Sequence, residues 1–150
     1  MKYKPEFVLH TGDMLDEGKN FPEWLEWISH QGEYLRDENR IIPVMPTLGN
    51  HERNSTYYYE LYQVERWYAL NFWNLTILSL NSEFGFDEQR RWLDNIKFNS
   101  IIIGFWHRTV ISSGPHENAT EFYRGVVVYL EEKGMILGFQ GHNHHYSSPN

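Results

Sequence analysis

Side chains that can bind a metal ion follow four separate apolar segments of this chain, and this repetition limits the fold more than any other feature of the sequence. The four junctions read FVLHT-Gly12-Asp13, IIPVMPTL-Gly49-Asn50-His51-Glu52, SIIIGFW-His107 and MILGFQ-Gly141-His142-Asn143-His144. Short apolar runs rich in β-branched residues are typical of buried strands. Open α/β sheets bind their ligands beyond the carboxyl ends of the strands, where loops converge. We therefore expect the four groups of side chains to meet at one site.

Strands alternate with helical patterns along the chain, which predicts an α/β fold built in layers. Strands are expected at residues 6–10, 40–46, 74–81, 100–106 and 135–140. The segment 67–81 is typical of a hairpin that turns near Trp73 and Asn74.

Helices are expected between these strands. The first begins near Pro22, and its predicted apolar face is made of Phe21, Trp24, Leu25, Ile28 and Leu35. A shorter helix is expected at 86–96, and another at 119–133 with Asn118 as its N-cap and Gly134 directly after its end. The tyrosines at 57–59 are interpreted as a half-buried helix face, in preference to the rim of a substrate entrance.

Composition narrows the class of protein and of partner. A chain of 150 residues without repeats or linkers is the size of one domain, so residues 1–150 are expected to form a single domain. The formal charge of -7 provides no basic face for nucleic acid, and no segment approaches the ~18 apolar residues of a membrane span. We expect a soluble protein that binds neither nucleic acid nor a membrane. Because cysteine is absent, a metal site must use histidine, carboxylate, amide oxygen and water.

The ordered set GDMLD, GNHE, a strand-end His107 and GHNH resembles the calcineurin-like metallophosphoesterase superfamily. The segment RWYALNFWNLTILSLNSE is similar to its purple-acid-phosphatase-like branch, and the likeness covers about residues 5–146. Each motif alone is short, but their occurrence in order, each behind a strand, is specific. The resemblance implies a layered β-sandwich flanked by helices (α/β/β/α) and a hydrolase that acts on a phosphate ester.

The resemblance also implies a role for each motif residue. In that family two divalent metal ions share a bridging aspartate, which matches Asp13. Asn50, His107 and His142 match ligands of the second ion, and His144 matches a ligand of the first. His51 matches the general acid that protonates the leaving group. Carboxylates can bridge two cations, and neutral ligands leave them electrophilic, so a metal-bound hydroxide would attack phosphorus.

Departures from the family pattern bear on the number and kind of ions. The D-x-H motif that ends the first strand of the family is absent, so Asp13 and His144 alone remain for the first ion. The family also continues beyond GHNH. We therefore expect a fragment, incomplete at both ends, with an exposed sheet edge suited to association. Asp16 replaces a tyrosine ligand of purple acid phosphatases, which favours Mn, Zn or Fe(II).

Other polar residues have ordinary interpretations. His10, His30 and His116 are expected to be surface or packing residues, and Asp16 a loop carboxylate. Glu52 is a candidate for orienting an imidazole. His145 is expected to face solvent or to lie just outside the site. Relatives are often secreted, whereas the first ten residues lack a signal peptide's apolar core, so the compartment stays open.

Two functions from different classes follow. The first is a metal-dependent phosphoric ester hydrolase, with the preference for monoesters or diesters open. The second is a non-catalytic remnant that binds one ion, or none, through Asp13, Asn50, His107 and His142. A structural zinc module is a weaker third interpretation, because such sites favour cysteine.

Overall fold

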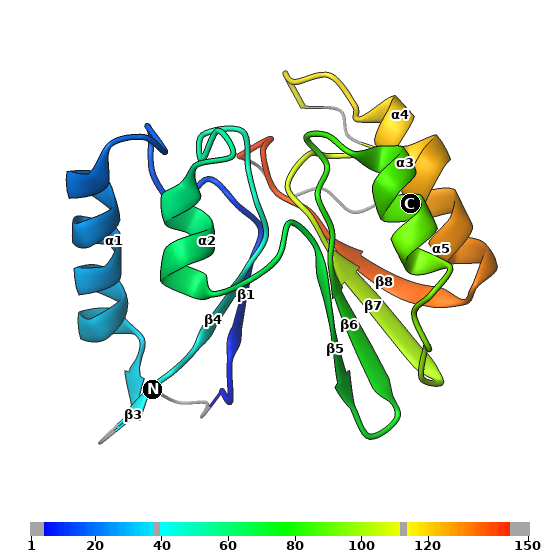
Figure 1. The fold of residues 1–150 in the computed structure, drawn as a ribbon, viewed down its shortest axis with the longest axis horizontal. Helices are drawn as coiled ribbons and strands as arrows, with labels where there is room; N and C mark the ends of the chain where they lie inside the picture. The colour runs from blue at the N-terminus through cyan, green and yellow to red at the C-terminus, as the bar shows by residue number, and fades with distance from the viewer. Residues whose placement is uncertain (1–4, 38–39, 112–113, 145–150) are drawn as a thin grey trace.

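The fold is built from layers, with helices on the outer side of each of two sheets (Figure 1). The computed structural model describes residues 5–37, 40–111 and 114–144. This mixed α/β architecture agrees with the predicted sandwich flanked by helices.

The first sheet pairs β1 (Val8–His10) with β4 (Val44–Pro46) in parallel. Helices α1 (Phe21–Tyr34) and α2 (Thr56–Tyr62) lie on one side of it (Figure 1). Their core with the adjoining loops consists of Met14, Trp24, Leu48 and Tyr58. Tyr58 is fully buried, which confirms the helical interpretation of the tyrosine run.

The second sheet has the strand order β5-β6-β7-β8. Strands β5 (Tyr68–Phe72) and β6 (Leu75–Ser79) form the predicted antiparallel hairpin, whereas β6, β7 (Ile101–Phe105) and β8 (Met135–Phe139) run parallel. Because these strands run in the same direction, their carboxyl ends lie at the same edge of the sheet, and crossover connections join them. The loops after β7 and β8 therefore leave the sheet together.

Helix α3 (Phe86–Leu93) and a second helical segment cover the outer face of this sheet (Figure 1). The second segment consists of α4 (Thr120–Phe122), the π-helical turn η1 (Tyr123–Val127) and α5 (Val128–Glu132). The buried core between helices and strands is formed by Leu78, Leu80, Leu93, Ile102, Trp106, Phe122, Val126, Val127 and Leu130.

Hydrogen bonds join the two sheets close to the ends of β4 and β6. The carbonyl oxygen of Pro46 accepts from the hydroxyls of Tyr68 at 2.7 Å and Ser79 at 3.1 Å. The hydroxyl of Thr47 donates to the carbonyl of Leu80 at 2.6 Å. These contacts fix the loop after β4 relative to the second sheet, and so to the loops that follow β7 and β8.

The prediction of one continuous strand at 40–46 is wrong. The structure divides it into β3 (Arg40–Ile41), which pairs with β2 (Arg36–Asp37), and β4, which pairs with β1. The chain changes partner at Ile42 and Pro43. The N–H of Ile42 still donates to Leu35, while the carbonyl of Pro43 accepts from Val8.

The predicted apolar face of α1 is also wrong in part. Trp24 is fully buried, but Phe21, Leu25 and Ile28 are exposed. Trp24 packs against Met14, Leu48 and Tyr58, which lie in the adjoining loops and on α2, so one stripe of α1 is buried.

Two other helix details differ from expectation. Ala119, not Asn118, is the N-cap, because the N–H of Ala119 is bound to the carbonyl of Thr109 and the helix begins one residue later. The helix expected at 86–96 ends at Leu93. Gly134, with φ of +89°, follows the last helix as predicted.

Edge strands remain open in the part of the chain that the structure describes. There, β1 pairs only with β4 and β8 only with β7, and Ile136, Leu137 and Phe139 of β8 are exposed. Association through a sheet edge stays a prediction. Within the same residues, no helix combines the length and hydropathy that crossing a membrane requires.

Candidate metal centre

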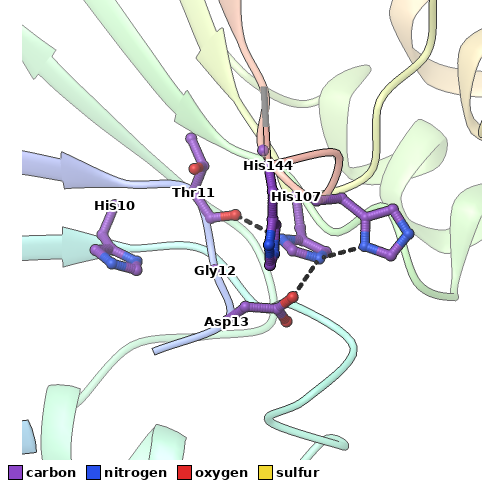
Figure 2. A pocket seen from close by; sticks show the side chains of 8 residues that line it. His10, Thr11, Gly12, Asp13, His107 and His144 are labelled. Atoms are coloured by element: carbon purple, nitrogen blue, oxygen red, sulfur yellow. Dashed lines mark hydrogen bonds and ion pairs between the residues drawn. The ribbon is translucent and has the colours of Figure 1, made fainter. Parts of the chain in front are cut away.

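A cavity of about 290 Å³ opens where the loops after β1, β7 and β8 meet (Figure 2). It is lined by His10, Thr11, Gly12, Asp13, His107, Gly141, His142 and His144. Three of the four sequence motifs contribute to this wall, and Asn50 from the fourth contacts His107 from the side.

The polar atoms of this site converge on Nε2 of His107. Oδ2 of Asp13, Oδ1 of Asn50 and Nδ1 of His142 each lie 3.0 Å from it. One ligand atom from each of Asp13, His107 and His142 lies within 4.8 Å of the others. The structure thus gathers four side chains that the sequence separates by more than a hundred residues.

The orientation of His107 is fixed from behind. Its ring is buried, and Nδ1 donates to the carbonyl oxygen of Thr11 at 2.8 Å (Figure 2). A carbonyl only accepts, so Nδ1 carries the hydrogen and Nε2 faces the site. A backbone acceptor of this kind holds a metal-binding imidazole in one tautomer.

Comparison with known proteins agrees with this geometry. The sequence description of the calcineurin-like phosphoesterase family matches residues 1–146. The chain belongs to the calcineurin-like phosphoesterase family. A search of curated protein sequences found no match. Family membership identifies the chain with metal-dependent phosphoesterases as a class.

The donor set at His107 fits the divalent ions that this family uses. It combines a carboxylate, two imidazoles and an amide oxygen, and it contains no thiolate. Such mixed nitrogen and oxygen sets suit borderline and harder divalent ions. Asp13, Asn50, His107 and His142 are therefore the residues of this family member that could hold an ion.

The backbone at the site is held in an uncommon conformation. Asp13, His142 and His144 have positive φ angles of 55°, 69° and 32°. Non-glycine residues adopt this region at an energetic cost and are enriched at functional sites. Gly12 allows the tight exit from β1, since it has φ of +86° and a Cβ there would lie 2.8 Å from the nitrogen of Gly49.

Glu52 joins the two loops that carry Asp13 and Asn50. Its buried carboxylate accepts backbone N–H groups from Gly49 at 2.6 Å, Asp13 at 3.1 Å and Met14 at 2.6 Å. The expectation that Glu52 orients an imidazole is wrong, because these backbone donors surround the carboxylate. Burial raises the pKa of Glu52 despite them.

Electrostatics favour an ionised Asp13 and a neutral His142. Burial opposes ionisation of Asp13, but hydrogen bonding to His107 and the positive charge of that ring outweigh it and lower the pKa of Asp13. The same pairing raises the pKa of His107 against the effect of burial. Burial, followed by the charge of His107, lowers the pKa of His142 to about 4. Neutral imidazole is the form that can bind a metal, so His142 can do so directly, whereas His107 must first lose the proton on Nε2.

His51 lies beside the ligands and not among them. Its backbone N–H donates to Oδ1 of Asp13 at 3.1 Å, and its ring Nδ1 is 2.8 Å from the carbonyl oxygen of Asp16. Nδ1 must donate to that carbonyl, which leaves Nε2 as the ring atom available to a substrate. The carboxylate of Asp16 is exposed on its loop, as expected.

His144 lines the cavity but lies outside the compact group of ligand atoms. His10 packs edge-on against Trp27, with ring centroids 5.1 Å apart, which agrees with its interpretation as a packing residue. His145 lies outside the described residues.

Two residues that contact His142 were not foreseen from the sequence. The ring of His116, interpreted as an ordinary residue, lies 4.4 Å from the ring of His142, centroid to centroid. The backbone N–H of His116 donates to Oδ1 of Asn143. Arg108 contacts His142 from the other side. The position of Arg108 directly after His107 was a signal in the sequence. His116 gave none, because its nearness to His142 depends on tertiary structure.

Proposed function

We propose that the chain is a metal-dependent hydrolase of phosphate esters, with one ion held by Asp13, Asn50, His107 and His142. The convergence of an oxygen or nitrogen from each of the other three side chains at 3.0 Å from Nε2 of His107 supports this proposal most directly. When bound, a divalent ion would polarise the phosphoryl group and activate water for attack.

A second ion is part of the proposal. Asp13 has a second carboxylate oxygen, and His144 lines the same cavity. Both residues would contribute to this ion, with Asp13 shared between the two. Mn, Zn and Fe suit the ligand types. The likeness of residues 66–83 to the purple-acid-phosphatase-like branch supports that narrower assignment.

His51 is proposed as the general acid. The carbonyl of Asp16 accepts from Nδ1, so the second N–H of a protonated ring, on Nε2, would be the one that a leaving group meets. The hydrogen bond from the His51 backbone to Asp13 keeps this imidazole beside the ligands. A donor held at that position can protonate a leaving alkoxide.

Asp13→Asn tests the proposal. We expect the purified chain with Mn²⁺ or Zn²⁺ to hydrolyse a chromogenic phosphate ester, and Asp13→Asn to lose both the activity and the bound metal, measured by plasma mass spectrometry. Asp87→Asn, an exposed carboxylate on α3, is the matched control and should change neither. Hydrolysis that persists after chelation and in Asp13→Asn would reject the proposal.

A non-catalytic chain that binds one ion is the second candidate. Its supporting observation is that the described residues supply one compact group of ligand atoms, whereas His144 stands apart from it. Metal stoichiometry separates the two candidates. Two ions per chain favour the hydrolase, and one ion without turnover favours the second candidate.

A further inference from the structure

Arg108 lies between the metal centre and the open surface. Its backbone N–H donates to Oγ of the buried Ser82 at 2.8 Å, which fixes the start of the side chain. Its Nη1 lies 3.5 Å from Nε2 of His142, the ring atom opposite the one that faces His107. The guanidinium is therefore one imidazole away from the convergence point of the ligands.

Glu83 fixes the direction of this guanidinium. Both carboxylate oxygens of Glu83 lie 2.9 Å from Nε of Arg108, and the Glu83 side chain is only 12% exposed. This contact uses the Nε edge alone. Of the five N–H donors of the guanidinium, those on Nη1 and Nη2 make no other contact in the described residues than the long one to His142. The side chain of Arg108 remains 35% exposed.

Space for a ligand adjoins this pair on two sides. Arg108 and Glu83 line one cavity of about 290 Å³ together with Ser82, Phe86 and Thr120. Glu83 also lines a second cavity of similar volume beside Asn50 and Arg53. The pair therefore lies next to His142 of the metal centre and lines space that could take the organic part of an ester.

We propose that Arg108 binds a non-bridging phosphoryl oxygen of the substrate and that Glu83 is the positioning residue for it. The inference rests on the proposed function, since it places the phosphoryl group at the cavity beside His142. The planar fork of arginine matches phosphate oxygens with paired N–H donors, and hydrogen bonds between charged groups are the stronger kind. The Nη edge that Glu83 leaves unused lies against His142, on the side of the ring away from His107.

Binding of inorganic phosphate to the Mn²⁺-loaded chain tests the assignment by calorimetry. Arg108→Gln should weaken phosphate binding about tenfold or more, in line with the loss of a charge-assisted hydrogen bond. Its metal content should stay the same. Arg108→Lys should recover part of the affinity. Arg90→Gln is the matched control, because Arg90 of α3 is 33% exposed and paired with Asp94 at the end of that helix, and the variant should bind phosphate like the wild type.

A double-mutant cycle tests the role of Glu83. Glu83→Gln should weaken phosphate binding in the wild-type background and have no further effect in Arg108→Gln, because Glu83 acts through Arg108. Independent, additive effects would overturn the positioning role.

The outcomes separate this inference from the proposed function. Phosphate binding that depends on Arg108 without turnover of any ester would reject the hydrolase and support the assignment. Turnover of an ester, together with the same phosphate affinity in Arg108→Gln as in the wild type, would support the hydrolase and overturn the assignment of Arg108. A metal-loaded wild type that binds no phosphate, or a loss of phosphate binding that merely follows a loss of metal, overturns the assignment.

Discussion

The carboxylate of Glu52 accepts the backbone N–H of Asp13 at 3.1 Å, although 39 positions separate the two residues. The same carboxylate accepts from Gly49 and Met14. One buried side chain thus holds together the loop after β1 and the loop after β4. Glu52 contacts the proposed metal ligand Asp13 through its backbone N–H, and so helps to place the side chain of Asp13.

Glu52→Gln should lower both stability and metal affinity. The amide would present an N–H₂ group to backbone donors, leaving at least one buried N–H without an acceptor, at a cost of about 1–3 kcal/mol for each such group. Urea denaturation and metal titration measure the two effects. Glu60→Gln, an exposed position on α2, is the control. If Glu52→Gln unfolds at the same urea concentration as the control, Glu52 does not join the loops as described.

Metal binding should stabilise the native chain. An ion that binds only the folded state at a hundredfold excess over its Kd adds about 2.7 kcal/mol. We expect Mn²⁺ or Zn²⁺ to raise the melting temperature, and chelation to reverse the rise. In His107→Ala the rise should be absent, because His107 lies at the centre of the ligand group. An equal rise in that variant would mean that the ion binds elsewhere.

The strands and the β5–β6 hairpin could be predicted from the sequence because their signals are local. Runs such as SIIIGFW are apolar on both faces, and a strand between two layers buries both. The meeting of Asp13 and His142 follows from the same pattern, since loops after parallel strands emerge at one edge.

Features that depend on tertiary contacts could not be predicted in this way. The sequence of α1 indicates an apolar face but not how much of that face its neighbours cover, and Leu25 of the predicted face is 54% exposed. The role of Glu52 required the position of a loop 38 residues earlier. The contact between the rings of His116 and His142 joins residues 26 positions apart, and no local pattern indicates it.

Two glycine substitutions should change stability in opposite directions. In Gly49→Ala the new Cβ would overlap Oδ1 of Asp13 and lie 2.8 Å from Oε2 of Glu52, so we expect a loss of about 1–3 kcal/mol. A Cβ added at Gly32, within α1, would meet no atom beyond its own helix backbone inside 4 Å, so Gly32→Ala should add about 0.5–1 kcal/mol through helix propensity. Denaturation midpoints measure both. A tolerated Gly49→Ala would contradict the close approach of the two loops.

The carboxyl of Asp94 should titrate below its usual range. A hydrogen bond from Arg90 at 2.6 Å, supported by one from the Tyr129 hydroxyl at 3.0 Å, lowers the pKa of Asp94. The folded-state pKa lies below the unfolded value. The contact therefore stabilises the fold above the unfolded pKa, and this contribution is lost as the pH falls through the folded pKa.

Carbon NMR titration of the Asp94 carboxyl measures this shift directly. In Arg90→Gln we expect the pKa of Asp94 to move up towards its usual value, because the strongest donor is removed. Tyr129→Phe should produce a smaller change in the same direction, since the hydroxyl is the weaker of the two donors. An unchanged titration in Arg90→Gln would show that the ion pair on α3 does not persist in solution, and Arg90 would then be a weaker match for Arg108 in the phosphate experiment.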